Sequence, residues 1–218
     1  MKLLLTSGGI TNKSISKALF ELVGKKPEET TLVFIPTAAN VEIGNKDWFI
    51  NDLANLYNQG FKSIDIADIS AVPIQIWKPK MDQADILFFE GGNTYHLMEW
   101  INKSGLAELL PTYLKTKVWA GISAGSMVTN PDLALKISQA VYDEDHEKKK
   151  PVDGLNYVNF YFLPHFGSPY FPKLTEDNIR KISEGIPTKI YAMDDQSALK
   201  VNDGRIEIVS QGKYLELN

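Results

Sequence analysis

Residues 121–125 read Gly121-Ile122-Ser123-Ala124-Gly125 and follow directly on the apolar run Lys117-Val118-Trp119-Ala120. A serine between two glycines behind a buried strand is typical of a sharp strand-to-helix turn, which exposes the hydroxyl at the edge of a sheet. A helix can then begin at Ser126. The stretch therefore predicts an α/β sheet with a serine nucleophile at its edge, as in a hydrolase. The alternative interpretation is a tight turn whose small residues only let a helix approach a strand.

Outward from this stretch, short apolar runs alternate with longer segments of helical period. The apolar runs are 3–6, 31–36, 64–66, 86–89, 118–122 and 161–163. The helical segments are 13–23, 48–57, 95–101 and 107–114. This alternation predicts a mostly parallel sheet with helices on both faces. Near the C-terminus, the segments 189–192, 198–201, 206–209 and 213–217 indicate short strands, with a hairpin turn at Asn202-Asp203-Gly204, and so an antiparallel edge on the parallel sheet.

Length and composition limit the function classes. The 218 residues suit one α/β domain over 1–218, and the 44% hydrophobic and 23% charged residues are ordinary for a globular protein. A net charge of −4 favours neither nucleic acid nor an anionic membrane as a partner. The N-terminal apolar run, Leu3-Leu4-Leu5, is too short for a secretory or membrane-spanning segment. It predicts a buried first strand in a cytoplasmic protein.

The chain contains no cysteine, so a covalent mechanism requires a hydroxyl nucleophile. The sequence has no H-E-x-x-H motif and no clustered histidines, and we expect neither a metal nor another cofactor. The segment 143–150 is rich in charge of both signs and precedes Pro151, which predicts a solvated loop.

Small and polar residues follow several predicted strands. The stretches are Ser7-Gly8-Gly9, Thr37-Ala38-Ala39-Asn40, Glu90-Gly91-Gly92-Asn93-Thr94, Ser123-Ala124-Gly125 and Pro164-His165-Phe166-Gly167. In parallel sheets, ligands bind at the carboxyl ends of the strands, where these stretches meet. The sequence therefore predicts a ligand site at this edge.

A serine nucleophile needs a base and a group that orients the base. Of the three histidines, His146 lies in the charged segment and His96 within a predicted helix, whereas His165 follows a predicted strand and is the candidate base. Two adjacent acids, Asp194 and Asp195, follow another predicted strand; they face opposite ways, and we favour Asp195. Further candidates for the acid lie between the serine and the base: Asp132, Asp143 and Asp153.

Acyl transfer also needs hydrogen-bond donors for the oxyanion. The N–H of Ala124 is one candidate, and the glycine pair at 91–92 offers a second from Gly92, because the backbone there can approach a substrate without a β-carbon. The competing interpretation of this glycine pair is a phosphate-binding loop, although no G-x-G-x-x-G or Walker motif is present. Asn93 and Thr94, which follow the pair, are candidate substrate-binding residues.

Taken together, the stretches 90–94, 121–125 and 164–166 resemble peptidase family S51, which includes dipeptidase E and cyanophycinase. The resemblance implies a fold like that of class I glutamine amidotransferase domains, with Ser123 as nucleophile, His165 as base and Gly92 in the oxyanion site. The segment Met193–Ala198 is similar to the late acidic segment of the family and points to Asp195, where the family usually has glutamate.

A second departure from the family concerns the substrate. Aspartyl dipeptidases carry an arginine after the catalytic histidine, whereas residues 168–178 contain only Lys173. Lys173 is a third candidate substrate-binding residue, since it could substitute as a point charge. It cannot replace the bidentate fork of arginine, so preference for N-terminal aspartate is not expected to carry over. The resemblance implies a serine peptidase acting on short peptides. The alternatives are a hydrolase of esters or other acyl compounds that uses the same site, and a silent ligand-binding domain.

Overall fold

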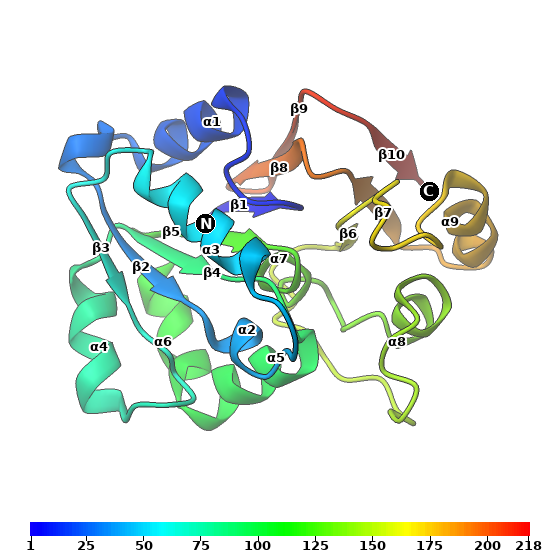
Figure 1. The fold of residues 1–218 in the computed structure, drawn as a ribbon, viewed down its shortest axis with the longest axis horizontal. Coiled ribbons are helices and arrows are strands. Elements are labelled where there is room, and N and C mark those ends of the chain that lie inside the picture. Colours follow the sequence, from blue (N-terminus) through cyan, green and yellow to red (C-terminus); the bar gives the residue numbers. More distant parts are fainter.

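Five parallel strands form the centre of the computed structural model, which describes residues 1–218 (Figure 1). They are β1 (Lys2–Thr6), β2 (Thr31–Ile35), β3 (Ser63–Ile66), β4 (Ile86–Phe89) and β5 (Val118–Ile122), in the order β3-β2-β4-β5-β1. β8 (Ser197–Asn202) and β9 (Arg205–Ser210) extend this sheet antiparallel beside β1. The predicted hairpin turn is confirmed, with positive φ at Asp203 and Gly204.

Helices cover both faces of this sheet because side chains alternate along each strand. Leu4, Phe34 and Phe88 face α1 (Lys13–Val23) and α3 (Asp47–Tyr57). Neighbouring strand residues such as Leu5 and Phe89 face α4 (Ile74–Gln83), α5 (Thr94–Lys103) and α6 (Leu106–Tyr113). The predicted α/β class, a mostly parallel sheet between helices, is confirmed.

Shorter helices and turns complete the chain. They are η1 (Pro27–Glu29), α2 (Thr37–Asn40), α7 (Ala124–Met127), α8 (Leu135–Ile137), η2 (Ser138–Tyr142) and α9 (Glu176–Ser183). None of the helices has the length and apolar character needed to cross a membrane.

A second sheet of three strands lies beside the first, at the side of the molecule that carries α9 (Figure 1). β6 (Phe160–Leu163) pairs in parallel with β7 (Lys189–Met193), and β10 (Tyr214–Leu217) pairs antiparallel with β7. The sequence analysis expected 161–163 in the main sheet and all four C-terminal strands at its edge. Only β8 and β9 lie there. Since β8 occupies the position beside β1, the other strands form their own sheet, which packs one face on α9.

The carboxyl ends of strands from both sheets meet at one place. The turns after β1, β4 and β5 come from the main sheet, and those after β6 and β7 come from the small sheet, with α7 in contact with β6. This meeting point carries the polar residues that the sequence analysis selected.

Candidate active site

Ser123 lies on a strained turn between β5 and α7. Its φ and ψ are 46° and −108°, a combination that non-glycine residues rarely adopt and that the surrounding structure must enforce. Its N–H donates to the Thr6 carbonyl (3.0 Å), and its carbonyl accepts from the N–H groups of Ser126 and Met127 (2.9 Å each). The turn is therefore held on both sides, and the Ser123 hydroxyl is left free to meet other groups.

Close contacts explain the two flanking glycines. A β-carbon at position 121 would lie 2.4 Å from the carbonyl of Gly125, and one at position 125 would lie 2.2 Å from the carbonyl oxygen of Phe89. Trp119 Nε1 donates to the Gly125 carbonyl (3.0 Å). The G-x-S-x-G spacing thus permits the tight approach of the turn to β4.

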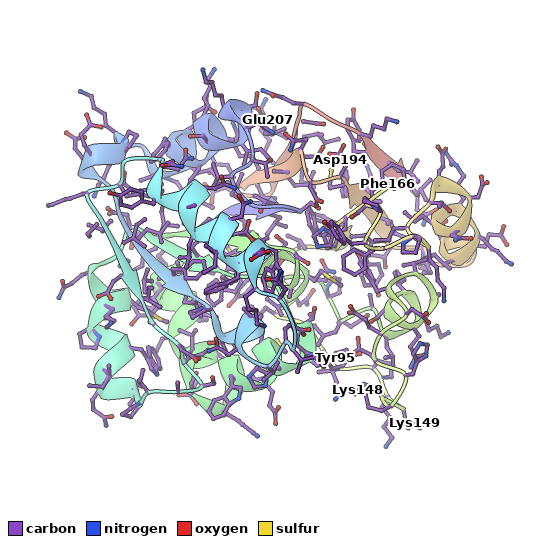
Figure 2. The ribbon with its side chains drawn as sticks, viewed as in Figure 1. Tyr95, Lys148, Lys149, Phe166, Asp194 and Glu207 are labelled. Carbon is purple, nitrogen blue, oxygen red and sulfur yellow. The ribbon has the colours of Figure 1, made fainter.

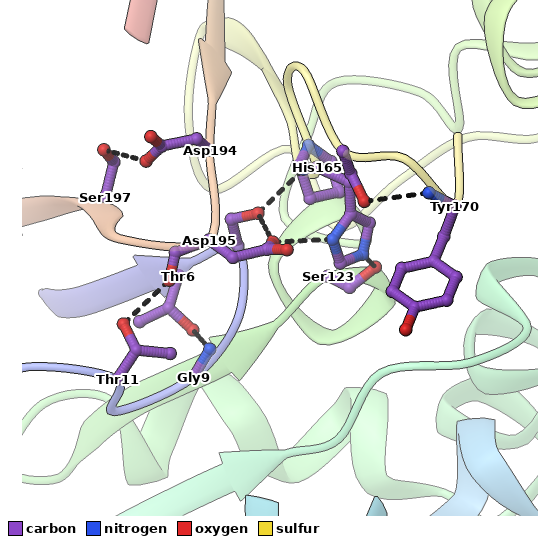
Figure 3. A network of polar contacts seen from close by, with 12 residues as sticks. Thr6, Gly9, Thr11, Ser123, His165, Tyr170, Asp194, Asp195 and Ser197 are labelled. Carbon is purple, nitrogen blue, oxygen red and sulfur yellow. Dashed lines mark hydrogen bonds and ion pairs between the residues drawn. The ribbon is translucent and has the colours of Figure 1, made fainter. Parts of the chain in front are cut away.

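His165 bridges the serine and an acid. Its Nε2 lies 2.9 Å from Ser123 Oγ, and its Nδ1 lies 2.7 Å from Oδ1 of Asp195 (Figure 3). Because an ionised carboxylate can only accept, Nδ1 carries the proton and Nε2 offers its lone pair to the serine hydroxyl. This tautomer is the one that a general base for Ser123 requires.

The position of His165 is set by its backbone and by an aromatic neighbour. Its φ of 64° lies in the left-handed region, and its N–H donates to Ser7 Oγ (2.7 Å). Its ring stacks on Phe171, with 4.9 Å between centroids and 15° between planes. Tyr142 OH donates to the carbonyl of Pro164, the preceding residue (3.0 Å). These contacts fix the imidazole between Ser123 and Asp195.

Asp195 sits against the turn after β1. A β-carbon on Gly8 would lie 2.8 Å from Asp195 Cβ, and Thr11 Oγ1 donates to the Asp195 carbonyl oxygen (2.7 Å). Partial burial alone would raise the pKa of this carboxyl, but the hydrogen bond and charge of His165, with a hydrogen bond from Ser7, outweigh it and hold the pKa below its ordinary value. The carboxylate is therefore ionised at neutral pH.

Ser7 is a residue of this network that the sequence analysis placed at the edge of the sheet but gave no role. Its Oγ donates to Oδ1 of Asp195 (2.6 Å) while it accepts the N–H of His165 (2.7 Å). The side chain is fully buried. The signal available in the sequence was its place after the first strand, in the stretch Ser7-Gly8-Gly9.

Asp194, the alternative acid, faces away from His165. Its Oδ1 accepts from Ser197 Oγ (2.6 Å) and from the N–H of Gln196 (3.0 Å), so it shapes the turn between β7 and β8 (Figure 3). The earlier acids lie in other contacts. Asp132 accepts from Tyr161 OH (2.6 Å), Asp143 pairs with His146 (2.9 Å) and Asp153 forms an isolated bridge with Asp132.

The backbone after β4 leaves one donor free beside the serine. The N–H of Glu90 donates to the Ile35 carbonyl (3.1 Å), that of Gly91 to Oε1 of Glu90 (2.9 Å) and that of Asn93 to the Ala38 carbonyl (3.0 Å). Gly92 donates to no protein atom, and neither does Ala124, which follows the serine. A β-carbon on Gly91 would lie 3.3 Å from Ser123 Cβ, so the backbone after β4 passes beside Ser123.

The three candidate substrate-binding residues are already engaged in contacts. Asn93 caps α5 by accepting the N–H of His96 (2.9 Å), and Thr94 Oγ1 lies 4.0 Å from Met127 Sδ. Lys173 pairs with Asp143 across 3.0 Å. The charged loop 143–150 is thus tied to the segment after His165.

A second contact ties this loop to α5. Lys148 Nζ lies 5.2 Å from the centroid of the Tyr95 ring (Figure 2). The loop is mostly exposed, as the sequence predicted, and these two contacts hold it to the rest of the protein.

The sequence matches the model of peptidase family S51 over residues 3–209. An uncharacterized peptidase from Pasteurella multocida is 26% identical over 180 residues, covering 81% of this chain and 83% of that protein. Peptidase E from Streptomyces coelicolor is 25% identical over 132 residues, covering 58% of this chain and 52% of that protein.

Solved structures show the same fold. A peptidase E candidate from Listeria monocytogenes EGD-e superposes with a TM-score of 0.77 at 24% identity, over 97% of this chain and 98% of that one. A peptidase from an acI-B1 actinobacterium gives a TM-score of 0.67 at 20% identity, over 99% and 93%. With the family model spanning nearly the whole sequence and with relatives that are peptidases, this chain belongs to peptidase family S51 and is a hydrolase of the peptidase class.

Proposed function

We propose that this peptidase hydrolyses short peptides by serine catalysis, with Ser123 as nucleophile, His165 as general base and Asp195 as the group that orients the base. The observation that carries the proposal is the unbroken chain of contacts from Ser123 Oγ through both nitrogens of His165 to Asp195, at 2.9 and 2.7 Å. A serine hydroxyl is a weak nucleophile unless such a base takes its proton.

In the first half of the reaction, Ser123 Oγ attacks the carbonyl carbon of the scissile bond while its proton passes to Nε2 of His165. The free N–H groups of Gly92 and Ala124 stabilise the negative oxygen of the tetrahedral intermediate. His165 then gives the proton to the leaving amine, the C–N bond breaks and an acyl ester on Ser123 remains.

In the second half, water attacks the acyl ester with His165 again accepting a proton. The Ser123 Oγ–C bond breaks, the hydroxyl regains its proton and the carboxylic acid product leaves. Asp195 keeps the imidazolium in place in both halves and stays ionised throughout.

Short peptides are the proposed substrate class because relatives of this chain are named peptidase E. Asn93, Thr94 and Lys173 are the proposed substrate contacts. Since Lys173 is already paired with Asp143, a strong preference for an acidic N-terminal residue is not expected.

The test is hydrolysis of a dipeptide panel, with Asp-x and other N-terminal residues, by the wild type, Ser123→Ala and Ser63→Ala. Ser63 is exposed on β3 and serves as the matched control. We expect turnover by the wild type and by Ser63→Ala, and its loss in Ser123→Ala. Full turnover by Ser123→Ala would overturn the proposal.

A short-chain ester panel and labelling of Ser123 by a fluorophosphonate distinguish the alternatives. Ester cleavage without dipeptide cleavage would point to another acyl substrate. Absence of labelling would point to a silent ligand-binding domain.

A further inference from the structure

Two carboxyl groups lie close to the backbone stretch 90–93, which we call the oxyanion segment. Glu90 directly follows β4 and has no exposed surface, and Asp52 comes from α3 on the same face of the sheet. A β-carbon on Gly9 would lie 3.7 Å from Oδ1 of Asp52 and 2.8 Å from Cδ1 of Ile122, which places the Asp52 carboxyl beside the turns after β1 and β5. Neither carboxyl has an ion-pair partner.

Glu90 holds the residue that precedes the free donor. Its Oε1 accepts the N–H of Gly91 (2.9 Å), and its own N–H is anchored on the Ile35 carbonyl (3.1 Å). Gly91 passes within contact distance of Ser123, and Gly92 follows. The Glu90 carboxyl therefore holds the peptide group that precedes the one carrying the Gly92 N–H.

The second oxygen of Glu90, Oε2, is buried and has no donor among the other groups of the protein. The Asp52 carboxyl interacts with that of Glu90, and a proton between the two acids would supply the missing hydrogen bond. The charged groups that bear on the pair are the two acids themselves and Asp195, all of them negative when ionised. If all three carboxylates were ionised, they would repel one another, and no cation is paired with Asp52 or Glu90 to compensate.

Burial is the main cause that raises the pKa of Asp52, to about 7, and the negative charge of Asp195 adds to it. Burial also raises the pKa of Glu90, and the charge of Asp52 raises it further. Both directions are those expected of two buried acids that share a proton.

We infer that the Asp52–Glu90 pair positions the oxyanion segment through one shared proton, and that loss of this proton at alkaline pH lowers turnover. The inference rests on the proposed function in one respect only, which is that turnover reads out the position of the Gly92 N–H. Glu90 acts through Gly91 and Gly92 and is a positioning residue.

Two variants of Glu90 separate the shared proton from the loss of the side chain. Glu90→Leu removes the acceptor for the Gly91 N–H, and we expect kcat to fall about tenfold with little change in KM, since a buried N–H is left without its hydrogen bond. Glu90→Gln keeps an oxygen for Gly91 and offers an N–H to Asp52, so it should restore most of the kcat lost in the leucine variant.

The pH profile tests the proton itself. The wild type should lose kcat as pH rises above neutrality, and Glu90→Gln, which has no proton to lose at that position, should not. Glu108→Gln, an exposed carboxyl on α6, is the matched control and should follow the wild type. If kcat falls at alkaline pH in the same way in Glu90→Gln and in the wild type, the inference of a shared proton is wrong.

Two readouts do not depend on turnover and so separate this inference from the proposed function. A carboxyl with a raised pKa in the folded state binds more protons than in the unfolded state, so the stability of the wild type should fall as pH rises from about 4 through about 7 and beyond. The Tm of Glu90→Gln should fall less over this range.

Hydrogen exchange of the segment 90–93 at pH 7 should be faster in Glu90→Leu than in Glu90→Gln. Equal exchange in the two variants would overturn the positioning role. If the wild type cleaves no substrate, the proposed function fails, while Tm and hydrogen exchange still decide this inference.

Discussion

Ser7 connects the acid and the base of the proposed triad with a single hydroxyl. It donates to Asp195 at 2.6 Å and accepts the main-chain N–H of His165 at 2.7 Å. The catalytic geometry therefore depends on a residue that touches no reacting atom.

We expect Ser7→Ala to lower kcat about tenfold with KM nearly unchanged, because a buried N–H loses its acceptor and Asp195 loses one of its two donors. Steady-state kinetics beside Ser63→Ala measures the effect. Wild-type kcat in Ser7→Ala would show that His165 and Phe171 suffice to hold the site.

At Asp195 itself, substitution by asparagine should lower kcat by about 10³-fold or more, because an amide can donate to Nδ1 and so favours the wrong imidazole tautomer. Asp194→Asn is the control, since the neighbouring side chain shapes the turn and faces away from His165. Similar losses in the two variants would mean that the turn, and not the charge of Asp195, limits the rate.

At the scale of elements, the conformation of the oxyanion segment depends on the backbone of one glycine. Gly92 has a φ of 123°, and a β-carbon there would lie 2.4 Å from the Ala38 carbonyl oxygen. Gly105 at the start of α6 also has a positive φ, of 81°, but a β-carbon added there would have no atom within 4 Å.

Gly92→Ala should therefore lower kcat about 10²-fold through displacement of the oxyanion donor. It should also lower the free energy of unfolding by about 2 kcal/mol or more through strain and clash. Gly105→Ala should lower stability by strain alone and leave kcat unchanged. Denaturant titration and kinetics on both variants separate the two effects.

At the scale of the whole molecule, the two sheets share one core. Phe160, Phe162 and Tyr191 of the small sheet belong to the same apolar cluster as Trp119 and Leu199 of the main sheet. The site lies where the sheets meet, so its geometry requires both sheets to be folded.

We propose that residues 1–218 form a single cooperative domain, and thermal unfolding followed by tryptophan fluorescence and by far-UV circular dichroism should give one coincident transition. Phe162→Ala, which opens a cavity in the shared core, should lower Tm for both probes by the same amount. Two separate transitions would identify the small sheet as an independent unit.

Local patterns were sufficient for most elements of the fold. Apolar runs of four to six residues predicted β1, β2, β4 and β5, and the 3.6-residue period predicted α1 over 13–23 with its actual ends. Two helices of eight or more residues were not predicted. α4 contains Pro79 and half of the residues of α9 are charged, so tertiary contacts of a few buried residues stabilise these helices against weak local signals.

The sequence by itself determined the α/β class, the glycine-flanked turn at Ser123 and the set of candidate residues at strand ends, because strand alternation, helical period and glycine requirements are local properties of the chain. Only the tertiary structure decided that β6, β7 and β10 form a separate sheet, that Asp195, the acid favoured from the sequence, meets His165, and that Ser7 connects these two residues. These features arise from contacts between residues far apart in the chain, and no local pattern specifies which strand ends become neighbours.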